Sequence, residues 1–388
     1  MSIATALFST AATGVGPAGQ PELPAPELAA AMAQYLQELR EYANAQQTYT
    51  AASQAYWASI AQKRKLRTSK RANSEELTID DYILTQPPVY SGPPQPINPS
   101  VPKERVPPAP AFVPVVGDFL AAAAQEFHFS PRKPQNEIEF KRAYARAAAA
   151  AGLTKDQVVR IYGFEATGNG TYDVQAGLEY NKPGEHAVST ALGYNQLLAT
   201  NSVELMAEQG SQFLETLNDR AAQLLGDQKE SFQSKIAIVQ EMINFSTSVP
   251  DDWSQHEILA GTVKGLGIHA MNLDLDVGPL LQTQKLLDSV LFARAKGLTA
   301  TLSAAELEMM NLTGDGNGFD MVTMPSSWRG QVPTANFFQP HGYEDNPVAQ
   351  RNNVVASLIA ATDAQMDEEV QKQGAKDLAE AFSQALQR

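Results

Sequence analysis

The sequence predicts a mostly α-helical protein, and three observations support this fold class. Residues 27–72 contain no glycine or proline and are dominated by Ala, Leu, Gln and Glu, which favour a long helix. Residues 117–386 contain successive segments whose apolar residues recur at the spacing of amphipathic helices. The polar and apolar alternation of a strand occurs in residues 171–189, where we expect one small β-hairpin insertion among the helices.

The composition excludes several classes of protein. The chain has 388 residues, of which 43% are hydrophobic, so it can bury a sizeable core. Its net charge of −14 makes it a poor general binder of nucleic acid, because phosphate binding needs clustered Lys and Arg. The absence of cysteine excludes disulfides, thiol catalysis and thiolate metal sites. No run of about 18 apolar residues occurs, so we predict no transmembrane helix.

The first 114 residues predict a tail, a helical arm and a linker. Residues 1–26 are rich in Ala, Gly, Pro and Thr and are expected to be disordered. Residues 27–86 form the arm, and the basic run KRKLRTSKR near the end of its helix either complements the helix dipole or docks an anionic partner. Residues 87–114 hold 11 of the 24 prolines, which predicts an extended, semi-rigid linker. Just before it, IDDYILTQPPVY either lies along the following domain or reaches a partner.

The remaining residues predict a helical domain at 115–346 and C-terminal helices at 347–388. The spacing of Thr154 and Gln157 is that of a capping box, and Ser303 stands in the same relation to Glu306. Within the domain, helices are expected at residues 117–127, 135–151, 154–165, 202–225, 227–247, 277–297 and 301–311.

Glu165 ends one of these helices and directly precedes a segment rich in Gly and Asn. If Tyr162 and Phe164 exclude water from it, burial raises the pKa of its carboxyl group. A carboxylic acid that stays protonated near neutral pH can donate a proton to a glycosidic oxygen. Gly168 and Gly170 would let the backbone pass close to a ligand. The alternative is that Glu165 is an ordinary loop or capping residue.

The segments that follow Glu165 supply groups suited to a sugar. Asn195 and Gln196 can hydrogen-bond sugar hydroxyl or N-acetyl groups. Tyr172, Tyr180 and Tyr194 offer flat faces on which sugar rings can lie.

The order of these features resembles the core of the soluble lytic transglycosylases and goose-type lysozymes. In that family a helix-ending Glu is followed by a small β segment and then by a Gly-x-x-Gln motif at the start of a helix. Here Glu165 is followed by residues 171–189 and then by the run from Gly193 to Gln196. Asn311, in LEMMNLTGDGNG, matches the Asn of a turn at the end of a later helix in the family. The resemblance covers residues 115–325 and implies a lysozyme-like helical domain.

The sequence departs from the family pattern at two positions near these motifs. Ala166 follows the candidate acid where Ser is usual, and Met310 stands before Asn311 where Tyr is usual. The extended segment NKPGEH also lengthens the spacing between Glu165 and Gln196. These departures concern the positioning of a substrate rather than the acid itself.

The resemblance implies a peptidoglycan lytic transglycosylase that cleaves the β-1,4 bond between N-acetylmuramic acid and N-acetylglucosamine. Glu165 would be its single catalytic acid and base. A hydrolase would need a second carboxylate, for which Asp173 is the best candidate, although a turn or surface position would also explain that residue. The substrate-binding residues that we expect are Gly193, Tyr194, Asn195, Gln196, Asn311, Tyr172 and Asp173.

The expected partner is the glycan strand of peptidoglycan, and we expect no cofactor and no metal. Such a substrate implies the periplasm or cell envelope, although residues 1–26 lack the basic and apolar regions of an ordinary signal peptide. The arm at residues 27–86 could bind a further partner in the envelope or in a secretion or phage apparatus. The alternative function is a non-catalytic peptidoglycan-binding or envelope scaffold protein on the same fold.

Three other segments have structural and functional interpretations. Residues 314–320, GDGNGFD, are similar to a calcium loop, but Ser326 stands where that loop needs Glu, so we expect a tight turn. His269 lies near two aspartates and is expected to be a structural histidine. An aromatic segment either lines a saccharide groove or attaches the C-terminal helices to the core; its residues are Trp328, Asn336, Phe337, Phe338 and Tyr343.

Overall fold

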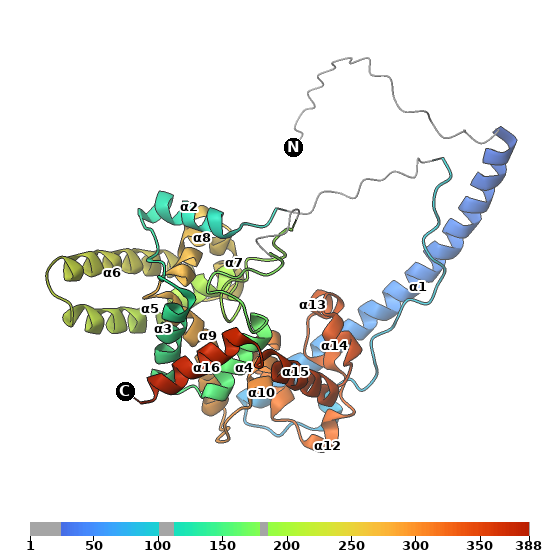
Figure 1. The fold of residues 1–388 in the computed structure, drawn as a ribbon. Helices are drawn as coiled ribbons and strands as arrows, with labels where there is room; N and C mark the ends of the chain where they lie inside the picture. Colours follow the sequence, from blue (N-terminus) through green and yellow to red (C-terminus); the bar gives the residue numbers. More distant parts are fainter. Residues whose placement is uncertain (1–24, 101–111, 179–184, 388) are drawn as a thin grey trace, which may run out of the picture. The chain divides into compact units, whose positions relative to one another are not determined.

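The computed structural model describes residues 25–100, 112–178 and 185–387, and the described residues are mostly helical, as predicted (Figure 1). The tail at residues 1–24, part of the Pro-rich linker and Tyr180 lie outside the described residues. The helices are α1 (Ala25–Ala72), α2 (Val116–Phe127), α3 (Glu137–Ala150), α4 (Lys155–Glu165), α5 (Ala199–Ala222), α6 (Gly226–Ser246), α7 (Trp253–Ala260), α8 (Val263–His269), α9 (Gly278–Ala295), α10 (Ala304–Thr313), α11 (Asp315–Val322), α12 (Ser326–Arg329), α13 (Pro340–Glu344), α14 (Pro347–Arg351), α15 (Val355–Glu369) and α16 (Gln373–Ala385), with short 3-10 turns at Ile79–Asp81, Ala270–Leu273 and Thr334–Asn336.

The chain divides into two compact units. The smaller unit comprises Met1–Tyr56 and Pro87–Ala109, and the larger one Trp57–Gln86 and Pro110–Arg388. Within the smaller unit, the ring of Tyr90 packs edge-on against Tyr42 and Tyr49 of α1, with centroids 6.2 and 5.6 Å away. The first residues of the Pro-rich linker therefore pack, at Tyr90, on α1.

The last turns of α1 belong to the core of the larger unit. Arg67 is fully buried and its Nε donates to Asp320 Oδ2 at 3.0 Å, while its two other nitrogens donate to backbone carbonyls of Asp81 and Asn336. The rings of Tyr82 and Phe337 lie 4.7 and 5.6 Å from its guanidinium carbon. Arg67 of the basic run thus binds a carboxylate and backbone carbonyls of its own chain. The sequence had suggested a helix-dipole interaction or an anionic partner instead.

The aromatic segment after residue 325 also packs on α1. Trp57 meets Tyr343 edge-on at 5.8 Å, and Phe337, Phe338 and Tyr343 are all buried. The segment therefore attaches the end of α1 to the helical body, as well as lying before the C-terminal helices.

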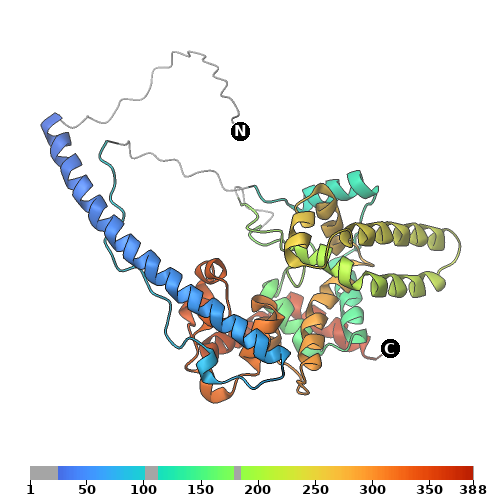
Figure 2. The same cartoon turned by 180° about the vertical axis from the view of Figure 1, so that it is seen from behind.

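The main apolar core lies among α2, α5, α6 and α8. Helices α5 and α6 form an antiparallel pair, seen in yellow and green in Figures 1 and 2. Buried side chains on α5 include Val203, Met206, Phe213 and Leu217, and α8 contributes Ile268. The spacing of the α5 residues is helical, which is why the sequence located this helix correctly.

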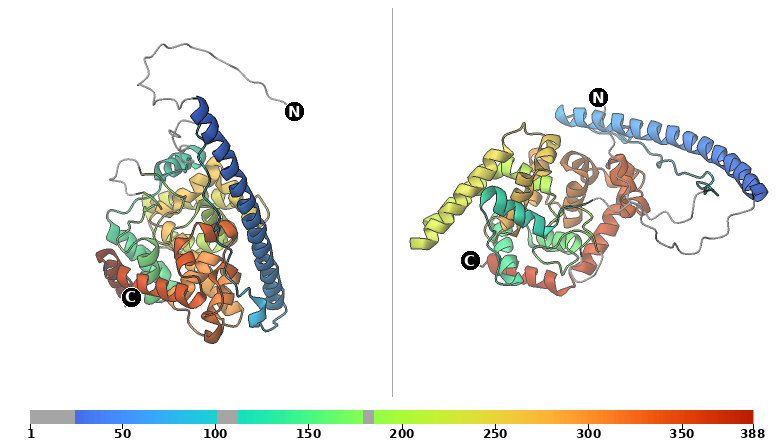
Figure 3. Two further views of the ribbon diagram at one scale, coloured as in Figure 1. Left: turned by 90° about the vertical axis from the view of Figure 1, so that its right-hand side faces the viewer. Right: turned by 90° about the horizontal axis from the view of Figure 1, so that it is seen from above.

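Helices α3 and α4 lie beside the C-terminal helices α15 and α16 (green and red in Figures 1 and 3). The capping box at Thr154 and Gln157 is confirmed, and the predicted apolar residues of α4 are buried. The capping box at Ser303 and Glu306 likewise begins α10.

Residues that follow Glu165 are held by the start of α16. The amide of Ala375 donates to the carbonyl of Gly168 at 2.8 Å, and Gly374 donates to Asn169 Oδ1 at 3.0 Å. A Cβ on Gly168 would lie 2.4 Å from the carbonyl oxygen of Glu369. The glycine therefore permits close packing within the chain, and not the approach of a ligand that the sequence suggested.

The predicted hairpin at residues 171–189 is not confirmed. Its described part contains no strand, and the β-structure nearby consists of isolated bridges from Leu192 to Gln175 and to Leu197. Residues 179–184 lie outside the described residues. A second difference is at residues 314–320, where the expected turn is instead the start of α11.

Two further predictions concern His269 and membrane-spanning helices. His269 is buried, and its ring nitrogens lie 2.8 Å from Ser202 Oγ and 2.8 Å from the carbonyl of Thr190, which confirms a structural histidine. Within the described ranges, none of the helices combines the length and the apolar character needed to cross a membrane.

Candidate active site

A cavity of about 940 Å³ lies beside the C-terminal end of α4. Its wall is built from the loop at residues 191–198 and from side chains of α5, α9 and α10, with Trp253 of α7 at one edge. The polar groups that line it include Glu165, Gln196, Lys285 and Asn311. Three of the residues singled out in the sequence, Glu165, Gln196 and Asn311, therefore meet in one cavity.

Glu165 is the last residue of α4; the residue is half-buried and lines the cavity. Burial raises the pKa of this carboxyl group above its ordinary value, and the ammonium group of Lys285 partly opposes that increase. Asn311 Nδ2 donates to Glu165 Oε1 over 3.3 Å. The acid predicted from the sequence is thus in an environment that favours its protonated form.

Glu308, on α10, is a second carboxyl group directly against Glu165. It is fully buried, and neither of its carboxyl oxygens accepts a hydrogen bond from an N–H or O–H group of the described residues. Burial, and then the charge of Glu165, hold the pKa of Glu308 well above its ordinary value. The two carboxyl groups lie close enough for each to shift the pKa of the other, and two negative charges so close together favour a state in which at least one group keeps its proton.

Helix α9 fixes the loop that carries Gln196. Gln282 accepts from the amide of Asn195 at 2.8 Å and donates to the carbonyl of Leu192 at 3.2 Å. Lys285, one turn later, donates to the carbonyl of Asn195 at 2.8 Å. Gly193 has a φ of +80°, and a Cβ there would lie 2.5 Å from Gln282 Nε2. Glycine is required at this position because the loop and α9 are in contact.

The cavity has further carboxylates on its α5 and α9 sides. Burial, followed by the charge of Glu208, raises the pKa of Glu204 to about 7. Burial also raises the pKa of Asp288 to about 6, although Gln284 donates to that carboxylate at 2.6 Å. Both residues line the cavity, so its net charge becomes less negative as the pH falls through 7 and 6.

Several predicted binding residues do not reach the cavity. Tyr194 and Asn195 are 0% exposed: the Tyr194 hydroxyl donates to Glu137, and Asn195 Nδ2 donates to the hydroxyl of Tyr144 at 2.7 Å. Their side chains therefore build the loop from inside and offer no surface to a sugar.

Tyr172 and Asp173 are also absent from the cavity wall. Tyr172 packs on Phe140 with ring centroids 5.1 Å apart. Asp173 accepts from the hydroxyl of Thr171 at 2.7 Å, as a turn residue does. The carboxyl group that lies beside Glu165 is Glu308, and not Asp173 as the sequence suggested.

The residues that the sequence analysis missed are Gln282, Lys285 and Glu308. Gln282 and Lys285 stand three residues apart on one face of α9, a spacing that many surface helices share. Glu308 gave a clearer signal, because it interrupts the otherwise apolar run of α10, where its neighbours Leu307, Met309 and Met310 are all buried.

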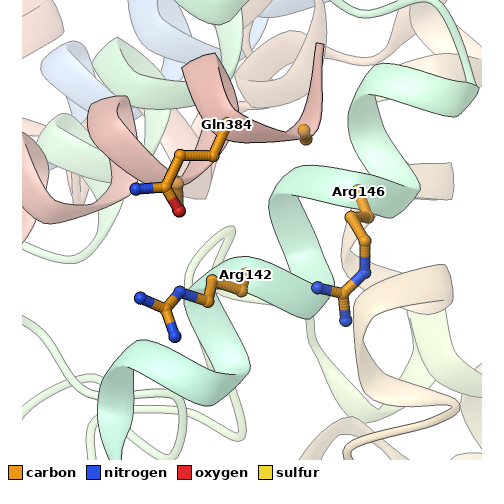
Figure 4. Close-up of a pocket in the computed structure, with 5 residues that line it drawn as sticks. Arg142, Arg146 and Gln384 are labelled. Carbon is orange, nitrogen blue, oxygen red and sulfur yellow. The ribbon is translucent and has the colours of Figure 1, made fainter. Parts of the chain in front are cut away.

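A second cavity, of about 370 Å³, lies between α3 and α16. Figure 4 shows Arg142 and Arg146 on α3, with Gln384 across from them on α16. Arginine remains protonated in proteins, so these side chains can bind an anion but cannot exchange protons with a substrate. The larger cavity is therefore the better candidate for an active site.

Within the described residues, no three His, Asp or Glu side chains come together as metal ligands. Comparison with known proteins found no family model, no curated protein and no solved structure that matches this chain.

Proposed function

We propose that the protein is a peptidoglycan lytic transglycosylase on a lysozyme-like helical domain, with Glu165 as its catalytic acid and base. The observation that supports this proposal is the position of Glu165, a carboxyl group with a raised pKa that opens onto a cavity also lined by Gln196 and Asn311. The cavity volume is within the range of sites that bind small organic molecules.

In the proposed reaction, protonated Glu165 donates its proton to the glycosidic oxygen as the bond to that oxygen breaks. The resulting carboxylate then removes the proton of the muramic 6-hydroxyl group, whose oxygen attacks the same anomeric carbon. The products are a 1,6-anhydro sugar and a new 4-hydroxyl end, and Glu165 regains its proton. The reaction consumes no water.

A transglycosylase fits the carboxyl groups of the cavity better than a hydrolase that uses Glu308. Retaining and inverting glycosidases keep their two carboxyl groups about 5 to 9 Å apart, to leave room for a sugar or a water. Glu308 is fully buried directly against Glu165 and does not line the cavity, so the pair leaves no such room. Glu204 and Asp288 remain as candidate second carboxylates for a hydrolase, and the reaction products distinguish the two mechanisms.

The test compares the native chain with Glu165→Gln on purified cell-wall sacculi. We expect the native chain to release soluble fragments and the variant to be slower by about 10² to 10⁴-fold, because proton transfer by a placed side chain contributes about that much. Asp173→Asn is a matched control, since that carboxylate lies outside the cavity. Mass spectrometry of the fragments should find 1,6-anhydro ends. Equal rates for native chain and Glu165→Gln would remove Glu165 as the acid.

The second candidate function is a non-catalytic peptidoglycan-binding or scaffold protein. The observation that favours it is Lys285, because its ammonium group opposes the increase in the pKa of Glu165 and so favours the ionised form, which cannot donate a proton. If this function is correct, the native chain sediments with sacculi and releases no fragments.

A further inference from the structure

We propose that Glu308 is a positioning residue that keeps its own proton and donates a hydrogen bond to the carboxylate of Glu165. The catalytic meaning of this inference rests on the proposed function, but the hydrogen bond itself does not. Glu308 would not touch the substrate: its partner is Glu165, and Glu165 is the group that faces the cavity.

The surroundings of Glu308 favour its protonated form. Its side chain is 0% exposed, and no N–H or O–H group of the described residues donates to either carboxyl oxygen. An ionised carboxylate in such a position would be buried without compensation, at a cost of several kcal/mol. A protonated Glu308 avoids that cost and gains a partner, because its O–H can donate to Glu165.

The two carboxyl groups differ in their contact with solvent and in their hydrogen-bond donors. Glu165 has surface toward the cavity, where water can solvate it, and accepts from Asn311 Nδ2. Glu308 has no solvated side, and Asn311 lowers its pKa by less than burial and the charge of Glu165 raise it. When the pair holds one proton, that proton is therefore on Glu308 and the negative charge is on Glu165.

The charged groups on the neighbouring helices are consistent with this assignment. Helix α4 presents Glu165, and α9 presents Lys285, whose ammonium group lowers the pKa of both carboxyl groups. On α11, the buried Asp320 is paired with Arg67 and Arg71. The residues that α15 buries are uncharged: Val355, Leu358, Thr362 and Met366.

The catalytic consequence concerns the interval between the two proton transfers. After Glu165 has protonated the leaving oxygen, its carboxylate must remain in place until the 6-hydroxyl group arrives. A hydrogen bond from Glu308 would stabilise that carboxylate and fix its orientation. The proton of Glu308 stays on Glu308 throughout, so the reaction remains balanced with Glu165 as the single acid and base.

The test is an NMR titration of the full chain with ¹³C-labelled Glu carboxyl groups, which needs no enzymatic activity. Signals of the pair are assigned with Glu165→Gln and Glu308→Gln. We expect the chemical shift of the Glu308 carboxyl carbon in the native chain to keep its protonated value between about pH 5 and pH 8. An ordinary Glu is ionised over this pH interval. An ionised Glu308 signal at neutral pH would overturn the proposal without any variant.

Two substitutions of Glu308 then test whether its side chain donates a hydrogen bond to Glu165 or only packs against it. Glu308→Leu removes the donor and should raise the titration midpoint of Glu165 by about one pH unit, since a hydrogen bond to a charged group stabilises it by about 1.5 kcal/mol or more. Glu308→Gln keeps an N–H donor and should return the midpoint to near its native value. Glu306→Gln, in the first turn of the same helix, is the matched control, because Gln can keep the capping hydrogen bond to Ser303.

The other results contradict the proposal in distinct ways. A lower midpoint in Glu308→Leu would mean that Glu308 is an anion in the native chain. If Glu165 has the same titration midpoint in the native chain, Glu308→Leu and Glu308→Gln, Glu308 only packs. The same conclusion follows if both variants shift that midpoint equally. Failure of the sacculus assay with the expected titration would refute the enzymatic function and leave the hydrogen bond standing.

Discussion

Glu204 illustrates how single residues of the cavity respond to burial. It is partly buried near Glu208, Asp251 and Asp288, and these conditions raise its pKa from 4.5 to about 7. The folded chain therefore holds a proton on Glu204 between these two pH values, where the unfolded chain has lost it. Stability from this residue is present at acidic pH and decreases as the pH rises through that interval.

We predict that Glu204→Gln changes stability only above the ordinary pKa of Glu. At about pH 4 the variant and the native chain should unfold at nearly the same denaturant concentration, because Glu204 is then mostly protonated in both the folded and the unfolded state. At about pH 8 the variant should be more stable by about 1 kcal/mol, a value reduced for the solvent that reaches this side chain. Urea unfolding at the two pH values measures the difference.

The exposed Glu215, on the same helix, provides the control for this prediction. Glu215→Gln should leave the pH dependence unchanged. A Glu204→Gln effect of the same size at both pH values would show that its carboxyl group titrates normally.

Helices α9 and α10 place the groups that surround Glu165. Helix α10 carries Glu308 and Asn311 three residues apart, so both face the end of α4. Its first turn is fixed by a capping box, in which Ser303 Oγ accepts from the amide of Glu306 at 3.2 Å and Glu306 accepts from the amide of Ser303 at 3.1 Å. The start of this helix is thus fixed by reciprocal hydrogen bonds between the exposed Ser303 and the half-buried Glu306.

We predict that Ser303→Ala destabilises the protein by about 1 kcal/mol, which is the typical cost of losing an N-cap. Ser303 is exposed, so the substitution removes no buried contact. Ser327→Ala is the matched control, because Ser327 is an exposed serine in a first helical turn that makes no side-chain cap. Urea unfolding of both variants tests this prediction, and equal loss in the two would contradict it.

At the scale of the whole molecule, the single helix α1 contributes residues to both compact units. Residues 57–72 of α1 belong to the larger unit, in which Arg67 and Arg71 pair with the buried Asp320. Lys70 pairs with Asp81 at 2.7 Å. The end of α1 is thus part of the core on which α11 packs, while residues before 57 belong to the smaller unit.

We predict different effects from two N-terminal truncations. A chain that lacks residues 1–56 should keep the unfolding midpoint of the larger unit, because the ion pairs of Asp320 remain. A chain that lacks residues 1–86 should lose about 3 to 5 kcal/mol, since Asp320 would be left buried without a partner. Thermal unfolding followed by circular dichroism measures both, and equal midpoints would show that this end of α1 contributes nothing to the larger unit.

The sequence by itself indicated most of the helices and three residues that line the cavity, Glu165, Gln196 and Asn311. Helical periodicity and capping signals are local, so α1, α4, α5 and α10 were predicted near their observed bounds. The motif from Gly193 to Gln196 identified the loop, although Tyr194 and Asn195 turned out to be internal supports. Periodicity shows that a residue is on a helix but does not show whether its side chain faces a cavity or the interior.

Only the tertiary structure decided which groups surround Glu165. Lys285 and Glu308 are 120 and 143 positions after it in the chain (285 − 165 and 308 − 165), and no local pattern links them to it. For the same reason the sequence suggested Asp173 as the second carboxyl group, whereas the group that lies beside Glu165 is Glu308. Contacts between helices depend on how their apolar faces pack, and that packing fixes burial, donors and pKa values together.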